Sequence, residues 1–263
     1  MARYWSIYCC DPFGVRLGDA SNFISLQYTR VVNDIGKLLL VLPGTFDTNL
    51  LRIPDGRIEV WRRLPGTSRE VLETETIWLI KTMRQSRDSR GRVTLTIEAH
   101  TPLCVVREPG RFIDISIGVD PSYAGPLDDA MKNIIRQNLG TLGVAARDLS
   151  GYISVAPNLA AAPSDTKVFP WRDVLKTLKE LATASTQAGT YLAFDIVAPT
   201  PSALEFRTYT GQRGVDHRFP GGQNPVIIGP EFGNMGECEL VTDYADEATY
   251  VVAGGRGELA ARL

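Results

Sequence analysis

Hydrophobic and polar residues alternate with a period of two through much of the first hundred positions of the chain. The alternation is clearest at 24–32, 72–81 and 93–99, and it is typical of strands that bury one face. The polar segment 85–91 is typical of a hairpin loop, and a further strand is expected at 57–61. Several short strands at this spacing predict a small barrel or sandwich.

A continuous aliphatic run occupies residues 38–42 and ends at Pro43. Such a run is expected for a strand that is buried on both faces, or for one that lies at a contact between subunits. The sequence is compatible with both interpretations. Leu38, Leu40 and Leu42 are therefore candidate residues of an oligomer or partner interface.

The hydrophobic period changes to that of helices in the middle of the chain. Apolar residues recur at helical spacing between Pro126 and Gly140. Proline and acidic residues suit the first turn of a helix and glycine commonly follows the last, so a helix is predicted between these two residues. A second amphipathic helix is expected from near Pro170 to Gly189. Residues 156–166, rich in alanine and proline, predict an extended connector between the helices.

The last part of the chain returns to strand patterns. Strands are expected at 191–197 and 204–209, on either side of a proline-containing loop. Three further strands are expected at 226–228, 237–242 and 248–253. The patterns together predict an α+β fold, mainly β, with small antiparallel β-barrel-like domains and a connecting region of two amphipathic helices.

This reading divides the chain into three regions. Residues 1–108 are expected to form an N-terminal β-barrel-like domain. Residues 109–188 are expected to form the connecting region with its two helices. Residues 189–263 are expected to form a second β-rich domain.

Composition limits the function classes only broadly. With 263 residues the chain is long enough for two packed domains. Its net charge of −2 argues against charge-driven binding of nucleic acid or an anionic membrane by the whole chain. No apolar run is long enough to cross a bilayer, and no signal-peptide pattern precedes the first strand, so we expect no membrane span and synthesis in a cytoplasm.

Metal and thiol chemistry find little support in the sequence. The chain has four cysteines and two histidines, none at the spacing of a zinc site: Cys9, Cys10, Cys104, Cys238, His100 and His217. We interpret the cysteines as reduced packing residues, because a free cysteine behaves as a small hydrophobic side chain. We expect no cofactor and no metal.

Candidate catalytic groups are equally sparse. Asp216 and His217 are adjacent within a glycine-rich segment, but no nucleophile motif accompanies them, so we interpret the pair as part of a turn. A glycosidase would need two carboxylates close together, and no spacing among Asp195, Glu205, Asp216 and Glu231 selects such a pair.

Two surface patterns point to binding. Basic residues recur between positions 52 and 92, and Arg84, Arg87 and Arg90 are candidate partner contacts, although acidic residues in the same stretch largely neutralise them. Aromatic residues alternate with polar ones on the predicted strands, as they would on a sugar-binding platform, but filling of a barrel is their more common role. These aromatic residues are Trp5, Tyr8, Trp61 and Trp78.

Several segments, in order along nearly the whole chain, resemble a siphovirus tail-protein family of tail-tip or baseplate-hub proteins. These segments are 28–43, 57–61, 75–80, 189–197, 204–218, 226–234 and 250–255. Members of the family usually continue past the glycine pair at 254–255. The last domain is therefore expected to lack a strand or to receive one from a partner, unless the chain is truncated after Leu263.

The resemblance implies a non-enzymatic structural role in the virion, in a homotrimeric ring at the tail tip. The implied partners are other copies of the chain, the distal tail protein, the tape-measure protein and the receptor-binding or tail-fibre proteins. It transfers no catalytic residue and no cofactor to this chain. A receptor- or glycan-binding tail module and a tail-associated cell-wall hydrolase are the alternatives.

Overall fold

The computed structural model describes residues 4–53, 55–64, 68–107, 122–168 and 172–211. Beyond these it describes 213–214, 216–217, 225–229, 231, 235, 237, 239 and 242. Residues 1–213 form one compact unit and residues 214–263 form another. The fold is α+β and mainly β, as the hydrophobic pattern predicted. All helices and strands given below lie in the first unit.

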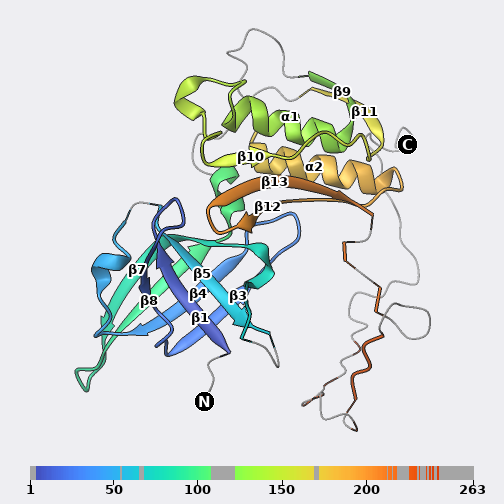
Figure 1. Cartoon of the computed structure of the whole chain (residues 1–263). Coiled ribbons are helices and arrows are strands. Elements are labelled where there is room, and N and C mark those ends of the chain that lie inside the picture. Colours follow the sequence, from blue (N-terminus) through green and yellow to red (C-terminus); the bar gives the residue numbers. More distant parts are fainter. Residues whose placement is uncertain are drawn as a thin grey trace, which may run out of the picture. The chain divides into compact units, whose positions relative to one another are not determined.

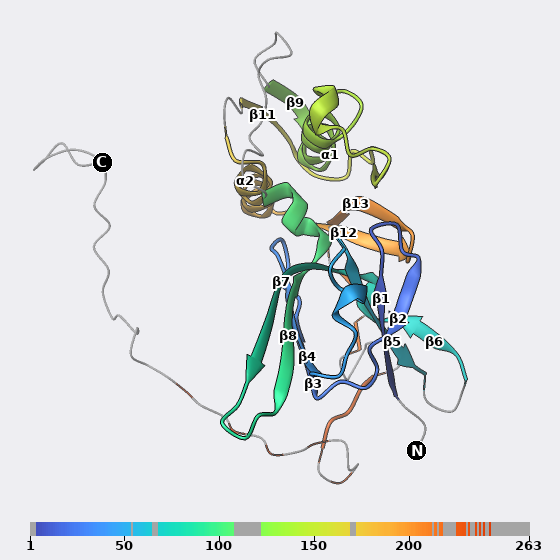
Figure 2. The ribbon, with the colours of Figure 1, turned by 90° about the vertical axis from the view of Figure 1, so that its left-hand side faces the viewer.

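The N-terminal part of this unit is a curved antiparallel sheet that wraps round its own interior (Figures 1 and 2). Its strands follow the order β2-β1-β5-β7-β8-β4-β3, with β6 beside β5. Among the described residues β2 and β3 do not pair, so the barrel is open at this seam. The strands are β1 (Trp5–Cys10), β2 (Arg16–Asp19), β3 (Ser25–Thr29), β4 (Lys37–Pro43), β5 (Arg57–Arg63), β6 (Glu70–Leu72), β7 (Trp78–Arg87) and β8 (Val93–His100).

The aliphatic run of β4 faces the barrel interior with alternate residues. Leu38, Leu40 and Leu42 are fully buried, whereas Leu39 and Val41 between them are partly exposed. Full burial of a leucine side chain contributes about 1.5–3 kcal/mol relative to exposure. The run therefore supplies the centre of the barrel core, with one face of the strand inside.

The strand predicted over 72–81 is interrupted, which corrects the prediction. β6 ends at Leu72, a 3₁₀ turn occupies Glu73–Glu75, and β7 begins at Trp78. Thr74 and Glu75 have φ of 57° and 48°, in the left-handed region that strands exclude. The turn is held by contacts from elsewhere in the barrel, because the Glu73 carboxylate accepts hydrogen bonds from Arg62 at 2.8 Å and Tyr28 at 3.2 Å.

The second part of the unit is a helical layer packed on a small sheet. In Figure 1, α1 (Leu127–Leu139) and α2 (Val174–Gln187) lie side by side over the hairpin of β12 (Leu192–Thr200) and β13 (Ala203–Thr210). Strand β10 (Ile153–Val155) pairs parallel to β13. A separate antiparallel pair is formed by β9 (Ser122–Pro126) and β11 (Ser164–Val168).

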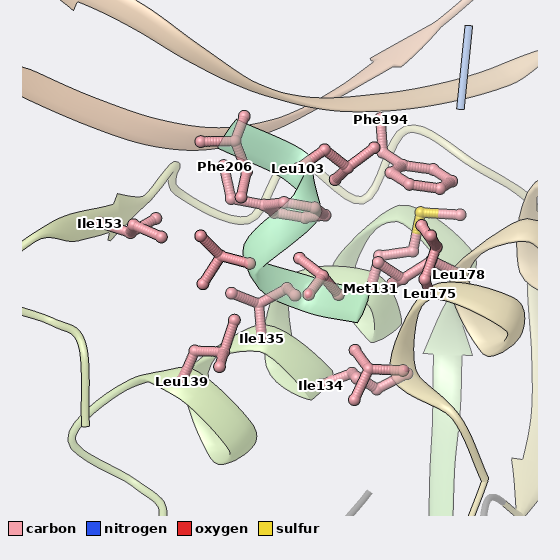
Figure 3. Packing of buried hydrophobic residues seen from close by; sticks show 14 of the residues in the cluster. Leu103, Met131, Ile134, Ile135, Leu139, Ile153, Leu175, Leu178, Phe194 and Phe206 are labelled. Carbon is pink, nitrogen blue, oxygen red and sulfur yellow. The ribbon is translucent and has the colours of Figure 1, made fainter. Parts of the chain in front are cut away.

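One hydrophobic core joins the helices to this sheet. Figure 3 shows Met131 and Leu178 from the two helices near Phe194 of β12, and Phe206 of β13 also belongs to this core. The two phenylalanine rings lie 6.2 Å apart. The core also includes Leu103 from the 3₁₀ turn that follows β8. The division of the chain at residues 108 and 188 stays a prediction.

The first predicted helix is confirmed at both ends. Pro126 precedes α1 and Gly140 follows its last turn. The second helix begins later than near Pro170, because Asp173 caps it by accepting a 2.7 Å hydrogen bond from the Lys176 amide. Pro170 itself lies outside the described residues.

The connector between the helices and the C-terminal segments differ from the sequence predictions to varying degrees. The connector 156–166 is irregular to residue 163 and then enters β11. Residues 226–228 carry no strand pairing in the described part of the chain, although the Val226 amide donates to the His217 carbonyl at 3.0 Å. The strands expected at 237–242 and 248–253 lie mostly or wholly outside the described residues. No described helix is both long enough and apolar enough to span a bilayer.

Candidate functional site

The β7–β8 hairpin is a projecting arm at the end of the barrel away from the helices (Figure 2). Its turn is held from within, because one Asp88 oxygen accepts the backbone N–H groups of Arg90 at 2.9 Å and Arg92 at 2.8 Å. Gly91 has φ of +77°, a conformation that glycine adopts without strain. The hairpin tip is therefore an ordered turn that places its side chains in solvent.

The arm carries an excess of positive charge. Residues 84–92 contain four arginines against the one aspartate that closes the turn. Across the described residues, the side chains of these arginines form no ion pair, and all four are exposed. An exposed guanidinium suits carboxylate or phosphate groups, to which it can donate two parallel hydrogen bonds. The arm is suited to contact an acidic surface outside its own unit.

The six predicted interface residues fall into two separate sets. Arg84, Arg87 and Arg90 lie exposed on the hairpin. Leu38, Leu40 and Leu42 lie in the barrel interior with no exposed surface, because alternate residues of β4 face inward. These leucine side chains are enclosed in the barrel core, so none of their surface is available to a partner. The interface role of the three arginines stays a prediction.

Buried polar contacts fasten the barrel to the β12–β13 hairpin. Arg57 of β5 is almost fully buried, and its guanidinium donates a 2.6 Å hydrogen bond to the Pro201 carbonyl in the hairpin turn. The same guanidinium lies over the Tyr152 ring, 5.5 Å from its centre. At Gly14 a Cβ atom would come within 2.7 Å of that carbonyl oxygen. The two parts of the unit are therefore in close contact at this turn.

Asn33 makes a second connection, to the free edge of β12. Its side-chain amide donates to the Leu192 carbonyl at 3.2 Å and accepts from the Phe194 amide at 2.8 Å. The side chain thus takes the place of a neighbouring strand. Beside it, Asp34 pairs with Lys179 of α2 at 2.7 Å. Burial opposes ionisation of Asp34, but the hydrogen bonds from Lys179 and the Ile35 amide outweigh it and lower its pKa.

Asp195, one of the candidate acids, is held between two arginines. It pairs with Arg30 from the barrel and, at 3.5 Å, with Arg213, which also stacks on Tyr209. Burial raises the pKa of Asp195, and the two guanidinium groups only partly oppose the shift. The carboxylate is engaged in binding the barrel to β12.

The other candidate acids have different surroundings. Glu205 pairs with Arg207 on its own strand. Asp216, His217 and Glu231 belong to the second compact unit. Within the first unit, Asp195 and Glu205 are each paired with arginine and do not form the pair of free carboxylates that glycoside hydrolysis needs.

The aromatic residues have three different environments. Trp78 is buried in the barrel core, as predicted, and Trp5 packs edge-on against Tyr28 at 6.5 Å. Tyr8 and Trp61 instead flank the guanidinium of Arg16, which lies 3.8 Å and 4.8 Å from their ring centres. These two ring faces are therefore occupied by the chain's own cation.

A buried charged cluster was missed by the sequence reasoning. Lys132 is fully buried on α1, with its Nζ atom 3.6 Å from Asp128 and 3.5 Å from Asp129. Asp129 also accepts the backbone amides of Leu159 and Ala160, and Asp128 those of the next two residues. The cluster fixes the connector against α1. The sequence pattern that could have revealed the cluster is the spacing of its residues: Lys132 follows Asp128 by four positions and Asp129 by three, on one helix.

The described cysteines, Cys9, Cys10 and Cys104, are buried thiols. Burial is the main cause that raises the pKa of Cys9 to about 12, and the pKa of Cys10 also rises, again mainly through burial. Cys104 packs in the core beneath the helices. No group of three or more potential metal ligands occurs in the part of the chain that the structure describes.

Sequence comparisons leave the chain without an assigned family. No protein-family model matches it, and no curated protein matches its sequence. The resemblance to a siphovirus tail-protein family therefore stays a prediction.

The solved structures similar to this chain include two that match it at low identity. The tail protein from Neisseria meningitidis MC58 is 12% identical with a TM-score of 0.42, over 78% of this chain and 50% of that one. The E. coli c3393 protein is 10% identical with a TM-score of 0.38, over 70% and 48%. It is described as a type VI secretion component structurally similar to the T4 bacteriophage tail proteins gp27 and gp5. The chain spans about half the length of each structure.

Proposed function

We propose that this chain is a structural component of a bacteriophage tail tip. In this role three copies form a hub-like ring in the virion. The ring joins the end of the tail tube, with its distal tail protein, and the tape-measure protein to the receptor-binding or tail-fibre proteins. The activity is assembly, and no catalytic step is included.

One structural observation carries the proposal: the arginine-bearing β7–β8 arm. Across the described residues of its own unit, the side chains at the tip are exposed on both faces of the hairpin. A projecting arm of this kind is suited to contact a neighbouring subunit. Seven segments of the chain resemble tail-tip proteins in the same order along the sequence. This resemblance is the reason why the proposed neighbour is another tail-tip subunit.

The contact should respond to salt. Exposed charges are screened over about 8 Å at physiological ionic strength. If the arginines of the arm meet acidic groups of a neighbour, assembly should weaken as the salt concentration rises. An assembly held only by apolar surfaces would not weaken in this way.

Light scattering after size exclusion tests the ring directly. The expected species has a mass three times the 28.9 kDa of one chain, and negative-stain images should show rings with an axial opening. A monodisperse monomer that also binds no distal tail or tape-measure protein would refute the proposal.

Charge reversal on the arm tests which surface is responsible. Arg87→Glu/Arg90→Glu should shift the protein toward monomer at a fixed concentration. The matched control is Arg52→Glu/Lys176→Glu, which makes the same change in charge at exposed positions outside the arm. Equal loss of assembly in the two variants would show that overall charge, and not the arm, controls association.

A further inference from the structure

One edge of β7 is unpaired along the arm. β5 pairs with β7 only through its first two residues, and a 2.9 Å hydrogen bond from the Ile80 amide to the Gly56 carbonyl lies at the end of this contact. Further along, β8 covers one side of β7, whereas no described strand pairs with the other side of residues 82–87 (Figure 2). In an antiparallel pair, alternate residues direct their backbone N–H and C=O groups away from the partner. The arm therefore presents an edge to which a further strand can add.

The two faces of this edge differ in character. Arg84 is exposed on one face, whereas Met83 on the other face is partly buried and packs against the barrel core. Side chains alternate between the two faces of a strand, and opposite charges on neighbouring strands attract. An added strand would therefore suit this edge if it placed acidic side chains beside Arg84 and apolar ones beside Met83.

Residues 237–242 of this chain have that pattern. Glu237 and Glu239 alternate with Cys238 and Leu240, which is the reason why a strand is predicted there. The two glutamates are exposed. In an extended segment they would share one face, and the cysteine and the leucine would share the other.

Charge is divided unevenly along the chain. Residues 214–263 contain eight acidic residues against three arginines, and no lysine or arginine occurs between positions 219 and 255. The first compact unit has the opposite balance, because the whole chain has 28 basic and 30 acidic residues. Opposite charges attract before two surfaces touch, which steers an acidic segment toward the arginine arm.

We infer that residues 237–242 of one copy add as a strand to the unpaired edge 82–87 of a neighbouring copy. The two glutamates of the segment then flank Arg84, and its apolar residues lie beside Met83. The inference rests on the proposed ring and names the contact that closes it. The arm of one copy meets a different surface of the next, and such head-to-tail contacts form a ring when the rotation between copies closes.

Hydrogen exchange of the intact chain locates the contact, by comparison of the assembled protein with protein dissociated by salt. Peptides that cover 82–87 and 237–242 should both exchange several-fold more slowly in the assembly. β3 is the control, because it is the other open border of the barrel sheet and should exchange equally in the two states. An assembly that leaves either peptide unprotected overturns the inference but not the ring. A monomer overturns both.

Charge exchange identifies the paired residues. Arg84→Glu should weaken association about ten-fold, because it replaces two cross-strand attractions by two repulsions. Adding Glu237→Arg/Glu239→Arg should restore association. The matched control adds Asp165→Arg/Glu180→Arg, the same change in charge at exposed carboxylates of the first unit, and should not restore it. Restoration by neither pair, or equal restoration by both, overturns the inference.

Cross-linking shows which copy supplies the segment. ¹⁵N-labelled and unlabelled Arg84→Lys protein are mixed before assembly and treated with a carbodiimide, which joins an amine to a carboxylate. The introduced amine should be joined to Glu237 or Glu239, in peptide pairs that include one labelled and one unlabelled member. If every joined pair is wholly labelled or wholly unlabelled, the segment binds the arm of its own chain, and the inference is overturned.

Discussion

Replacement of Lys132 by methionine tests the energetic role of the buried charged cluster. The Nζ atom lies 3.6 Å and 3.5 Å from its two carboxylate partners, and the lysine is fully buried. At an effective dielectric constant of about 20, each attraction amounts to roughly 4–5 kcal/mol. Desolvation of the ammonium offsets much of this, and removing one partner of a buried pair typically costs about 3–5 kcal/mol. We expect Lys132→Met to destabilise the protein by that amount.

Urea unfolding followed by circular dichroism measures the change in the free energy of unfolding. Lys176→Met is the control, because this lysine is exposed on α2 and its loss should change stability by no more than about 0.5 kcal/mol. Hydrogen exchange should show faster exchange at the amides of Leu159 to Ala162, whose acceptors are the two aspartates. Adding Asp128→Asn to Lys132→Met should recover about 1–2 kcal/mol, because one uncompensated charge is removed. A loss no larger than that of the control would refute the reasoning.

Three further predictions concern Asp195, the buried thiols of Cys9 and Cys10, and the side chain of Asn33. Burial raises the pKa of Asp195, so the stability that this group contributes is present below about pH 4 and is lost as the pH rises through the raised pKa. The stability of Asp195→Asn relative to that of the unaltered chain should therefore increase as the pH is raised from 4 to 7, measured by thermal melts. A relative stability that falls over this pH range would contradict the prediction. Cys9 and Cys10 are buried and their pKa values are raised, so Ellman's reagent should modify neither thiol in the native protein at pH 8. Unfolding in urea should make both thiols reactive. Rapid modification of both thiols in the native protein would show that they are not buried. Asn33→Ala should lose about 2–3 kcal/mol in urea titrations, because it loses two hydrogen bonds and places a Cβ-bearing residue without a compensating side-chain contact at a φ of 57°. Asn33→Gly loses the same two hydrogen bonds but adopts this φ without strain, so it should lose less. An equal or larger loss in Asn33→Gly would contradict the backbone part of this reasoning.

The sequence predicted those parts of the fold that depend on local pattern. Pro126 and Gly140 bound α1 as expected, and the alternation at 93–99 became β8. The failures lie where distant residues decide the local conformation. Alternation continues through 72–81, but Arg62 and Tyr28 bind Glu73 and stabilise a turn there. The hydrophobic alternation of a segment does not reveal contacts made by residues that are distant in the sequence.

The candidate surface was predictable to a similar extent. The polar composition of 85–91 predicted a hairpin loop, and the structure has Arg84, Arg87 and Arg90 exposed on this hairpin. The leucines of β4 were harder to interpret, because a run of five aliphatic residues does not reveal that only every second one faces the core. A cavity lined by Tyr152 could not be predicted from the sequence. Its walls come from positions as far apart as Phe13 and Leu149.

The amide of Asn33 has a consequence for how the small sheet could be extended. A visiting strand needs unoccupied backbone donors and acceptors along an edge. On β12 the Leu192 carbonyl and the Phe194 amide are already taken by a side chain. A strand contributed by another polypeptide would therefore pair more readily with the opposite edge of this sheet. That edge is β10, so the added strand would lie parallel or antiparallel to Ile153–Val155.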